Sequence, residues 1–399
     1  MAVENNQTDI SVVIVSYKCL SVLRMALVAI RNAANGVDAD IYVVDNASGD
    51  GTVEYLKNNF SWVNVIENKE NVGFSRANNQ ALSQCRGRVV LVLNPDTIIP
   101  RSFLRAVVDH FDNANGKGAL GVQMTDGTGT YLKESKRGYP GISASFCKLT
   151  GLWRLAPQSA RLNAYYVGQY GKNDVCRAPI LSGACMAFSH TLMQQAGVFD
   201  ESYFMYGEDI DLSWRYNLAS DGNDYRGDMQ IVHFKGISTP RRLRYIRYFY
   251  NAMVKFARHY ESPKHFILTN MFVRIGIFFG YMFASVKCLI LKMSDCFHHS
   301  RTLKRVALAT ADIKSAEAFA AGCGPAVAVD TVSLDTLSKL NLYSAVVFDV
   351  DADIEAVIDF MKKNRKSVPF GFYSRTEQFA FVYENNDCRV IFDKNKTIA

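Results

Sequence analysis

The stretch Ser11-Val-Val-Ile-Val-Ser16 is an uninterrupted apolar run that ends on a polar side chain. Such a short run is typical of a strand that is buried on both faces. Apolar residues at helical spacing follow it over Leu20–Asn32, and a second apolar run covers Ile41–Asp45. Strands that alternate with helices at these intervals predict an α/β fold built on a parallel sheet.

The same alternation continues along the first half of the chain. Further strands are expected at Val63–Ile66, Val89–Leu93, Ile180–Ser189 and Met229–His233, and further helices at Thr52–Asn59, Gly73–Cys85, His190–Ala196 and Asp209–Ser220. Between Gly121 and about Arg177 the pattern weakens, which predicts an irregular connection with short strands. In open α/β sheets, ligands bind at the carboxyl ends of the strands. Ser16, Asp45 and Asp96 all follow such ends and mark the expected site.

Composition limits the class of protein. The chain has 399 residues, of which 49% are hydrophobic and 21% charged, so it is long enough for two or three domains with sizeable cores. A net charge of +7 fits a protein that meets phosphates or an anionic membrane surface, and does not by itself imply nucleic acid. The nine cysteines include no CxxC pair, and Met1–Asp9 is polar. We therefore expect reduced thiols, no secretory signal and a cytoplasmic location.

A basic and aromatic stretch, Arg241–Tyr260, precedes the very apolar segment Phe266–Leu291. The charge-free part of that segment, Ile275–Val286, is shorter than the roughly 18 to 20 residues that a spanning helix needs. A helix lying in the membrane interface is therefore favoured over a helix buried in protein or a true span. The basic stretch could bind RNA, but its position beside the apolar segment favours anionic lipid.

A second α/β pattern begins near Arg305. Five strands are expected, at Val306–Ala309, Ala326–Val329, Ala345–Val350, Phe370–Tyr373 and Arg389–Phe392. The predicted organisation is a catalytic domain over residues 1–240, a membrane-association segment over 241–300, and a small Rossmann-like or receiver-like accessory domain over 301–399. Asp349 ends the third of these strands, where a receiver carries its phosphorylated aspartate. The acidic pair that receivers carry after the first strand is reduced here to Asp312, which favours a degenerate accessory domain.

Four polar clusters carry the expected chemistry. In Val43–Asp50, the side chains of Asp45, Asn46 and Ser48 can bind a base or ribose, although they also suit a turn that caps the next helix. In Glu70–Asn79, Gly73 allows close backbone approach, so that Arg76 and Asn78 can reach a nucleotide. A loop leading into a helix is the alternative.

The other two clusters supply carboxylates. The strand Leu91-Val-Leu ends at Asn94-Pro-Asp96, and a carboxylate there suits Mg²⁺ or Mn²⁺ bound together with substrate phosphates. A simple Pro-Asp turn is the alternative. After Ser182-Gly183-Ala184, the residues Glu208, Asp209 and Asp211 crowd the start of a helix. The helix dipole favours acidic side chains at this position, but one of them can also act as a general base for an acceptor hydroxyl.

Together, these motifs resemble the family 2 inverting glycosyltransferases of the GT-A fold, and more narrowly their bacterial rhamnosyltransferase-type members. The resemblance runs through VVIVSY, VVDNASGD, ENVGFSRANN, LVLNPD, SGACMAF, GEDIDLSWR and HFKGIST. It implies a Rossmann-like mixed sheet. It also implies a donor site made from Ser16, Asp45, Asn46, Ser48, Arg76, Asn78, Asn94, Asp96 and Gly183. Asp209, next to Glu208, would be the catalytic base, and Asp96 and His233 would lie at the metal.

The resemblance implies a single displacement with inversion, in which a sugar leaves a nucleotide-diphosphate donor. Mg²⁺ or Mn²⁺ would be the cofactor, and a polysaccharide or polyprenyl-diphosphate-linked saccharide at the inner membrane face the acceptor; rhamnose is the sugar it suggests. Two departures matter: Asn94 replaces the first acid of the usual Asp-x-Asp, and Asp45-Asn46 replaces Asp-Asp, which leaves uridine and thymidine donors open. A nucleotidyltransferase lacks support because no glycine-rich loop follows the first strand. A non-catalytic nucleotide-binding or sugar-binding scaffold is the other alternative.

Overall fold

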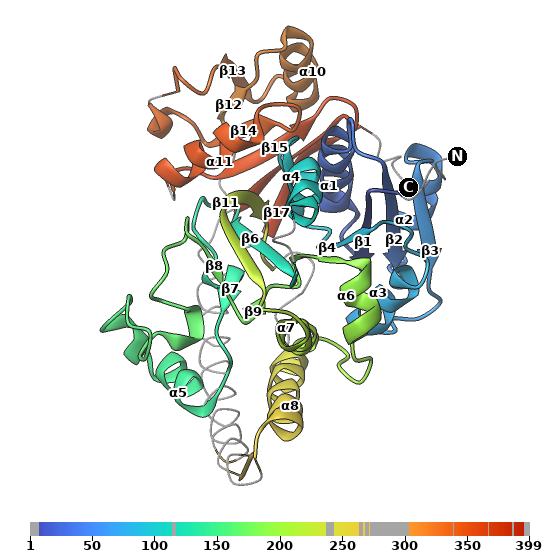
Figure 1. The fold of residues 1–399 in the computed structure, drawn as a ribbon. Helices are drawn as coiled ribbons and strands as arrows, with labels where there is room; N and C mark the ends of the chain where they lie inside the picture. Colours follow the sequence, from blue (N-terminus) through green and yellow to red (C-terminus); the bar gives the residue numbers. More distant parts are fainter. Residues whose placement is uncertain are drawn as a thin grey trace.

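The structure of the protein is a computed structural model. It describes residues 8–113, 117–236, 243–262, 266–267, 271, 303–337, 339–365, 367–384 and 387–394. Two large sheets organise these residues, one of nine strands and one of six, and a two-stranded sheet accompanies them. Figure 1 shows the six-stranded sheet, formed by the C-terminal part of the chain, packed against the nine-stranded one.

The nine-stranded sheet begins with four parallel strands, as the alternating pattern predicts. They are β1 (Ile10–Ser16), β2 (Ala39–Asp45), β3 (Val63–Glu67) and β4 (Val89–Leu93). Their order is β3-β2-β1-β4, so β1 is central. Every residue of β1 is buried, which explains why its sequence is a continuous apolar run rather than an alternating one.

The other half of this sheet is mixed. It contains β5 (Thr97–Ile98), β6 (Leu120–Thr125), β8 (Val175–Arg177), β10 (Cys185–Ser189) and β11 (Asp224–His233). Strand β10 runs antiparallel to β4 and to β6, and β11 runs antiparallel to β5 and to β8. The expectation of a wholly parallel sheet from strand–helix alternation was therefore wrong, and the mixed sheet implied by the resemblance is present.

The strand expected over Ile180–Ser189 is two strands. Residues Ile180–Leu181 form β9, which pairs with β7 (Lys136–Arg137) in the small sheet, and Cys185–Ser189 form β10. The turn at Ser182-Gly183-Ala184 separates them. This break moves the Ser-Gly-Ala motif from a strand interior to a turn, where the Gly183 amide donates to Asp209.

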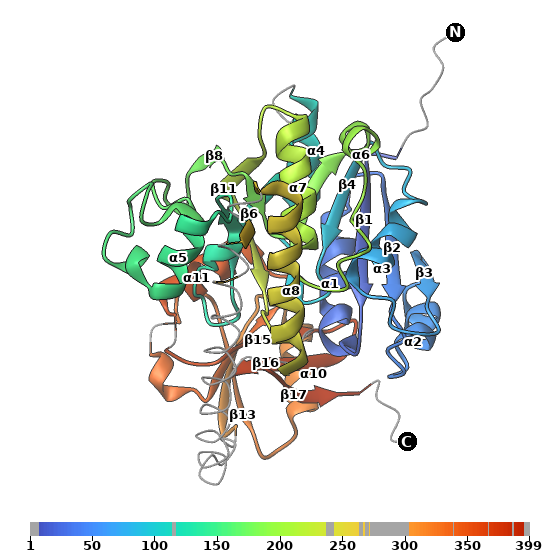
Figure 2. The same cartoon turned by 90° about the horizontal axis from the view of Figure 1, so that it is seen from below.

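Helices cover both faces of the nine-stranded sheet. They are α1 (Leu20–Ala33), α2 (Thr52–Asn59), α3 (Phe74–Leu82), α4 (Phe103–Asp112), α5 (Ile142–Thr150), α6 (His190–Ala196), α7 (Glu208–Ala219) and α8 (Leu243–Tyr260), with the 3₁₀ turns η1 (Lys133–Ser135), η2 (Leu152–Arg154) and η3 (Ala164–Tyr166). Ile14 packs in the cluster that contains α1 and α4, whereas its neighbour Val13 packs with α3, α6 and α7. Figure 2 shows α7 and α8 on the face opposite the six-stranded sheet.

The C-terminal sheet contains β12 (Arg305–Ala309), β13 (Ala328–Val332), β14 (Ala345–Asp349), β15 (Phe370–Ser374), β16 (Phe379–Glu384) and β17 (Asp387–Asp393), with α10 (Ile313–Cys323), α11 (Ile354–Lys363) and η4 (Leu340–Leu342). The order is β13-β12-β14-β15-β16-β17. Five strands were expected and β16 was missed. Strands β16 and β17 are antiparallel, so the expectation of a purely parallel sheet was wrong here too.

The two sheets share one hydrophobic core. Phe234, which directly follows β11, is 1% exposed and packs against Phe372, Phe381 and Tyr383, with ring centroids 5.2 to 5.6 Å apart. The Tyr383 hydroxyl also donates to the Lys235 backbone carbonyl at 3.0 Å. The C-terminal sheet therefore supports the end of β11, where the expected site residue His233 lies.

The segment expected to associate with the membrane is described in part. Residues Leu243–Tyr260 form helix α8, as the basic and aromatic stretch allows. Most of Phe266–Leu291 lies outside the described residues, so the interpretation of that segment is not addressed by the structure. Among the helices that the structure does describe, none is both long and apolar enough to cross a membrane.

Candidate active site

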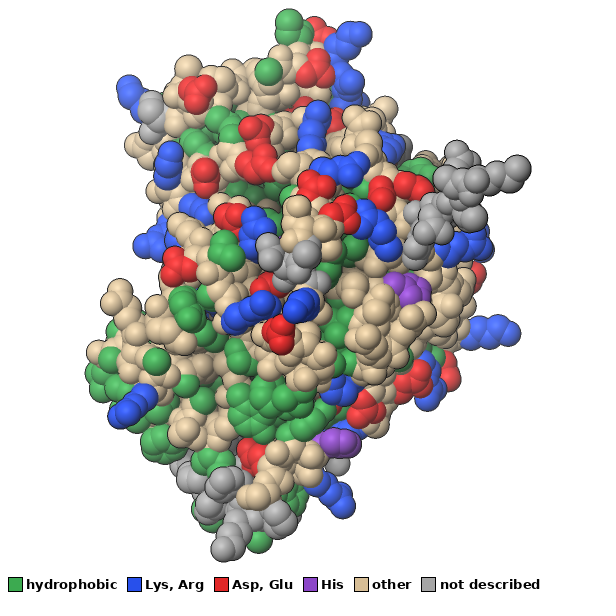
Figure 3. Space-filling model, in the orientation of Figure 1, with side chains coloured by type: hydrophobic (Ala, Val, Ile, Leu, Met, Phe, Trp, Pro, Cys, Tyr) green, Lys and Arg blue, Asp and Glu red, His purple; other side chains and the backbone are tan. Residues whose placement is uncertain are grey.

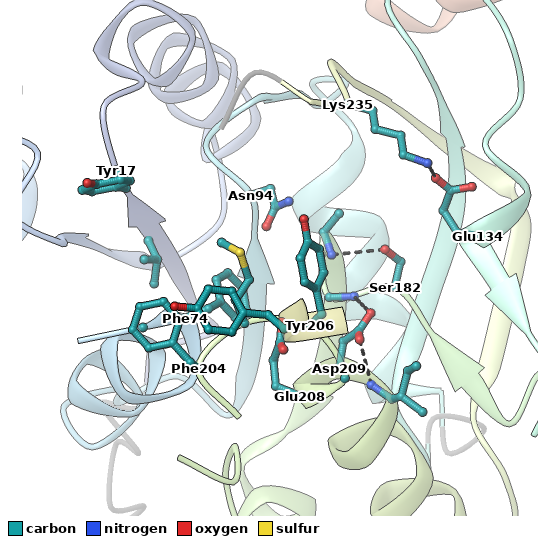
Figure 4. Close-up of a pocket in the computed structure, with 18 of the residues that line it drawn as sticks. Tyr17, Phe74, Asn94, Glu134, Ser182, Phe204, Tyr206, Glu208, Asp209 and Lys235 are labelled. Carbon is teal, nitrogen blue, oxygen red and sulfur yellow. Dashed lines mark hydrogen bonds and ion pairs between the residues drawn. The ribbon is translucent and has the colours of Figure 1, made fainter. Parts of the chain in front are cut away.

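A cavity of about 460 Å³ opens at the carboxyl ends of β1 and β4, where the sequence places the site. Its walls include Val15 and Tyr17 from the end of β1 and Asn94 from the end of β4, and His233 closes one side. Helix α7 begins at its floor with Glu208 and Asp209. Figure 4 shows Tyr17, Asn94, Glu208 and Asp209 around this cavity, on segments that are far apart in the sequence.

Asp209 is held by two donors. Its Oδ2 accepts a hydrogen bond from Arg137 Nη2 at 2.5 Å and from the Gly183 backbone amide at 3.2 Å. A Cβ at Gly183 would lie 2.9 Å from the Cβ of Asp209, so the close approach requires glycine. Because both donors come from the small β7–β9 sheet or the turn after it, that sheet fixes the direction in which the carboxylate points.

Glu208 lies next to Asp209 in a different environment. Its side chain is buried, and among the described residues no hydrogen-bond partner reaches its Oε2. Burial, and then the negative charge of Asp209, raises the pKa of the Glu208 carboxyl to about 8. Two adjacent carboxyls thus differ in character, since one is paired with a guanidinium and the other favours its neutral form at pH 7.

Asp96 and His233 meet at the other side of the cavity. The distance between Asp96 Oδ1 and His233 Nε2 is 3.3 Å, and Asn94 Nδ2 lies 3.4 Å from the same imidazole nitrogen. The carboxyl of Asp96 is fully buried, and its backbone carbonyl accepts a hydrogen bond from the Phe234 amide at 2.8 Å. The two residues are 137 positions apart and meet because β5 pairs with the end of β11.

The side chains at this point suit a divalent cation whose coordination is completed by substrate phosphates. Within the parts of the chain that the structure describes, no group of three or more His, Cys, Asp or Glu side chains is placed to hold a metal by itself. Asp96 supplies one carboxylate and His233 one imidazole. Because Mg²⁺ and Mn²⁺ are often bound by one or two carboxylates together with substrate phosphates, these residues fit such a cation only as part of a shared site.

The Asp45–Ser48 cluster orders the loops beside the cavity. Asp45 Oδ2 accepts from the Ser48 amide at 3.0 Å, and Ser48 Oγ accepts from the Lys18 amide at 2.9 Å. Asn46 lines the cavity, and its amide bonds to Asn71, Val72 and Gly73 fix the loop that precedes α3. Asp45 Oδ1 is buried with no hydrogen-bond partner among the described residues, so the carboxylate retains acceptor capacity.

Six of the nine expected donor residues do not line this cavity: Asp45, Ser48 and Asp96, described above, and Ser16, Arg76 and Asn78. Ser16 is fully buried and contacts the Cys19 thiol at 3.4 Å. Arg76 is on the surface and pairs with Glu201 at 3.1 Å, and Asn78 is buried inside α3, where it donates to the Phe74 carbonyl. Their roles at a nucleotide stay predictions, and in this structure their contacts hold the surrounding helices and loops together.

Several cavity residues were missed by the sequence analysis. Arg137 contacts Asp209 but occurs in an irregular stretch with no recognisable motif. Lys235, paired with Glu134, also lines the cavity. Tyr206 points into the cavity between Asn94 and Ser182 (Figure 4), and its φ of 68° is a left-handed value that bulky residues rarely adopt. Strained backbone of this kind concentrates at functional sites.

Comparison with known proteins matches the same part of the chain. Residues 11–194 match the family model described as "Glycosyl transferase family 2". Two curated relatives are each 26% identical. One is "N-acetylglucosaminyl-diphospho-decaprenol L-rhamnosyltransferase" of Mycobacterium tuberculosis, aligned over 50% of this chain and 68% of the relative. The other is "Low-salt glycan biosynthesis hexosyltransferase Agl10" of Haloferax volcanii, aligned over 56% of this chain and 66% of the relative.

Among solved structures, one similar fold is the mannosyltransferase PcManGT from Pyrobaculum calidifontis in complex with GDP-Man and Mn²⁺. It is 17% identical, with a TM-score of 0.43, and the match covers 74% of this chain and 77% of that one.

Proposed function

This chain is a family 2 glycosyltransferase, and on that premise we propose that it transfers a sugar, with inversion, from a nucleoside-diphosphate donor to a hydroxyl of a lipid-linked saccharide. The observation that carries the proposal is the placement of Asp209. Its carboxylate faces the cavity, held by Arg137 and the Gly183 amide, at the start of α7.

We assign the donor to the side of the cavity formed by β1, β2 and β4. Tyr17 and Asn46 line that side, and the carboxylate of Asp45 lies behind them with acceptor capacity for a base or ribose donor group. Lys235, on the wall near His233, adds a cation where a diphosphate has to be accommodated. These positions agree with the general rule that nucleotides bind at the carboxyl ends of parallel strands.

The diphosphate is assigned to the vicinity of Asp96 and His233. A divalent cation shared between these side chains and the donor phosphates would neutralise the charge of the departing nucleoside diphosphate. Asn94, in place of an acid, contributes a neutral side chain that contacts the His233 imidazole at 3.4 Å. The protein itself therefore supplies little negative charge there, which leaves the cation available to the phosphates. Mg²⁺ and Mn²⁺ are both compatible with this donor set.

Asp209 is assigned as the general base and Glu208 as a neutral neighbour. An ionised Asp209 accepts the proton of the acceptor hydroxyl as its oxygen attacks the anomeric carbon, and the bond to the diphosphate oxygen breaks on the opposite face of the ring. Burial keeps Glu208 protonated near neutral pH, so a second charge does not repel the incoming oxygen. Arg137 orients Asp209 through the ion pair between them.

The substrate classes follow from the relatives by analogy. The mycobacterial relative is named for transfer of L-rhamnose to N-acetylglucosaminyl-diphospho-decaprenol. We propose a deoxyhexose or hexose donor for this chain, with rhamnose first among them, and a saccharide carried on a polyprenyl diphosphate. An acceptor of that kind resides in a membrane, so the proposed location is peripheral, on the cytoplasmic face.

The direct test is release of nucleoside diphosphate from a panel of UDP-, dTDP- and GDP-sugars, with Mg²⁺ or Mn²⁺ and a lipid extract that contains acceptor. Wild type is compared with Asp209→Asn and with Asp221→Asn. Asp221 follows the end of α7, and its exposed carboxylate pairs with Lys117. Acceptor-dependent release from one donor, lost in Asp209→Asn and kept in Asp221→Asn, supports the proposal. Release that survives in Asp209→Asn refutes the assignment of the base.

A further inference from the structure

The segment from α5 to η3 presents unusually exposed apolar side chains. Phe146, Leu149, Leu155 and Leu162 have exposed fractions of 44%, 56%, 78% and 37%. All four lie within seventeen positions of one another in sequence, on α5 or in the turns that follow it. Figure 3 shows green side chains gathered over the lower left of the molecule, where Figure 1 places α5. Large apolar side chains clustered on a surface mark an interaction site more often than scattered ones do.

The charge of the same segment is one-sided. From Ser135 to Asn173 the sequence contains no aspartate or glutamate, whereas it contains Lys148, Arg154 and Arg161 close to the exposed leucines. The nearest acid before it, Glu134, is paired with Lys235. Across the whole chain there are 38 acidic residues in 399, so a stretch of this length without one departs from the composition of the rest.

Aromatic rings and cations are interleaved in this surface. Lys133 Nζ lies 3.8 Å from the ring centroid of Trp153, and the Arg154 guanidinium lies 5.5 Å from the same ring. Lys148 Nζ lies 3.7 Å from the ring of Tyr165, which is buried. Tryptophan, with an apolar body and a polar edge, is a side chain that proteins place beside lysine and arginine at the boundary between lipid headgroups and acyl chains.

We propose that the surface formed by Phe146, Leu149, Leu155 and Leu162 with Lys148, Arg154 and Arg161 docks on an anionic lipid bilayer. The leucines enter the headgroup boundary while the basic side chains contact lipid phosphates. RNA is less well matched, because stacking on bases requires accessible aromatic faces and the Trp153 ring is already covered by two cations. Glu261 lines the groove beside α5 together with Phe146.

This docking surface adjoins the candidate active site. Arg137, which contacts Asp209, lies five positions before the first residue of α5. Tyr139 packs against Trp214 of α7, with ring centroids 4.7 Å apart and the rings tilted by 52°. A bilayer held against α5 is therefore next to the wall of the cavity that carries the base. The inference rests on the proposed lipid-linked acceptor, because a soluble acceptor would need no such approach.

The test is vesicle flotation of the full chain with phosphatidylcholine vesicles that contain, or lack, phosphatidylglycerol. In the double variant Leu149→Ser and Leu155→Ser, we expect half-maximal binding to require at least ten times more anionic lipid than in wild type. Arg154→Glu with Arg161→Glu should weaken binding to anionic vesicles and leave binding to neutral ones nearly unchanged, since only the first depends on charge.

A matched control removes equally exposed apolar side chains elsewhere. Leu218 and Ile313 are 62% and 74% exposed, and the double variant Leu218→Ser and Ile313→Ser should bind vesicles within two-fold of wild type. If the lipid needed for half-maximal binding changes less than two-fold in the Leu149/Leu155 variant, or if the control loses binding equally, the docking surface is overturned. Nucleoside diphosphate release with detergent-solubilised lipid extract is measured in parallel. It should match wild type in the Leu149/Leu155 variant and in the Leu218/Ile313 control. Absence of release from wild type would refute the proposed function and leave the vesicle result to be judged by itself.

Discussion

Replacing Arg24 with methionine should destabilise the protein strongly, because this arginine joins the two sheets. It lies in α1 with 2% of its surface exposed. Its Nε is 3.2 Å from Glu377 Oε2, and its Nη1 is 2.8 Å from Asp393 Oδ2. The guanidinium also lies 4.5 Å from the centroid of the Phe379 ring. The variant retains an apolar stem of similar length but removes the cation from between two carboxylates.

The expected loss can be worked from these contacts. Removing one partner of a buried ion pair costs about 3–5 kcal/mol, because the remaining charge is left in a poorly solvated place. Asp393, whose side chain is 12% exposed and lies near the end of β17, can partly recover solvent, which places the expectation near the lower end, about 3 kcal/mol. Arg76→Met is the matched control. Its pair with Glu201 has side-chain exposures of 55% and 44%, and exposed pairs contribute about 0–1 kcal/mol.

The assay is urea unfolding of the full chain, followed by tryptophan fluorescence and by circular dichroism, for wild type and both variants. Coincident transitions by the two probes justify a single free energy of unfolding. A double-mutant cycle with Glu377→Gln isolates the pairwise part of the loss. If Arg24→Met costs no more than Arg76→Met, the buried ion pair does not join the two sheets in the way inferred here.

Four further outcomes are expected. Asp209→Asn should lower kcat by about 10²-fold or more, as expected for loss of a general base, whereas Glu208→Gln, which mimics the neutral acid, should keep most of the activity; equal losses would contradict the division of roles. Burial and the charge of Asp209 raise the pKa of Glu208 to about 8 in the folded protein. That is above the value of about 4.3 in an unfolded chain, so the contribution of Glu208 to stability is complete below that value and is lost as the pH rises through 8. The free energy of unfolding of wild type should therefore fall relative to that of Glu208→Gln between pH 5 and 9. The same difference between the two proteins at both pH values would disprove this. Gly183→Ala places a Cβ 2.9 Å from Asp209 Cβ and should lower kcat at least ten-fold while the melting temperature stays close to wild type; an unaffected kcat would show that the close approach is not needed. Removal of divalent cations with EDTA should abolish nucleoside diphosphate release and Mn²⁺ or Mg²⁺ should restore it, with Asp96→Asn needing at least ten times more cation, and undiminished release in EDTA would exclude the shared site.

The local pattern of the sequence was sufficient for most individual elements. The boundaries expected for Thr52–Asn59, Val89–Leu93 and His190–Ala196 coincide with α2, β4 and α6. Each of these depends on a short apolar or amphipathic run with a clear end, and such runs are determined by neighbours within a few residues. The position of Asp96 at the end of β4 followed for the same reason, because a strand end can be located from the strand itself.

Strand direction and long-range pairing were decided only by the tertiary structure. An apolar run such as Cys185–Ser189 fits a parallel or an antiparallel neighbour equally well, and its direction depends on the turn at Ser182–Ala184 and on pairing with β4. The same is true of β16, whose buried strand Phe379–Glu384 packs onto Phe234 from the other sheet.

The same distinction applies to individual charged residues: some were predicted from the sequence, and others have a role that only the tertiary structure shows. Motifs in the sequence predicted Asp96 and Asp209 as site residues, because short polar side chains next to buried strands and at a helix start can be recognised without a structure, and the family resemblance predicted His233. No sequence motif points to Arg137 or Arg24, because their carboxylate partners lie 72 and 353 positions away. A charged side chain in a sequence is ordinarily solvated. Only the packing of β7 against β9, and of α1 against the C-terminal sheet, removes these two from water and makes their carboxylate partners necessary.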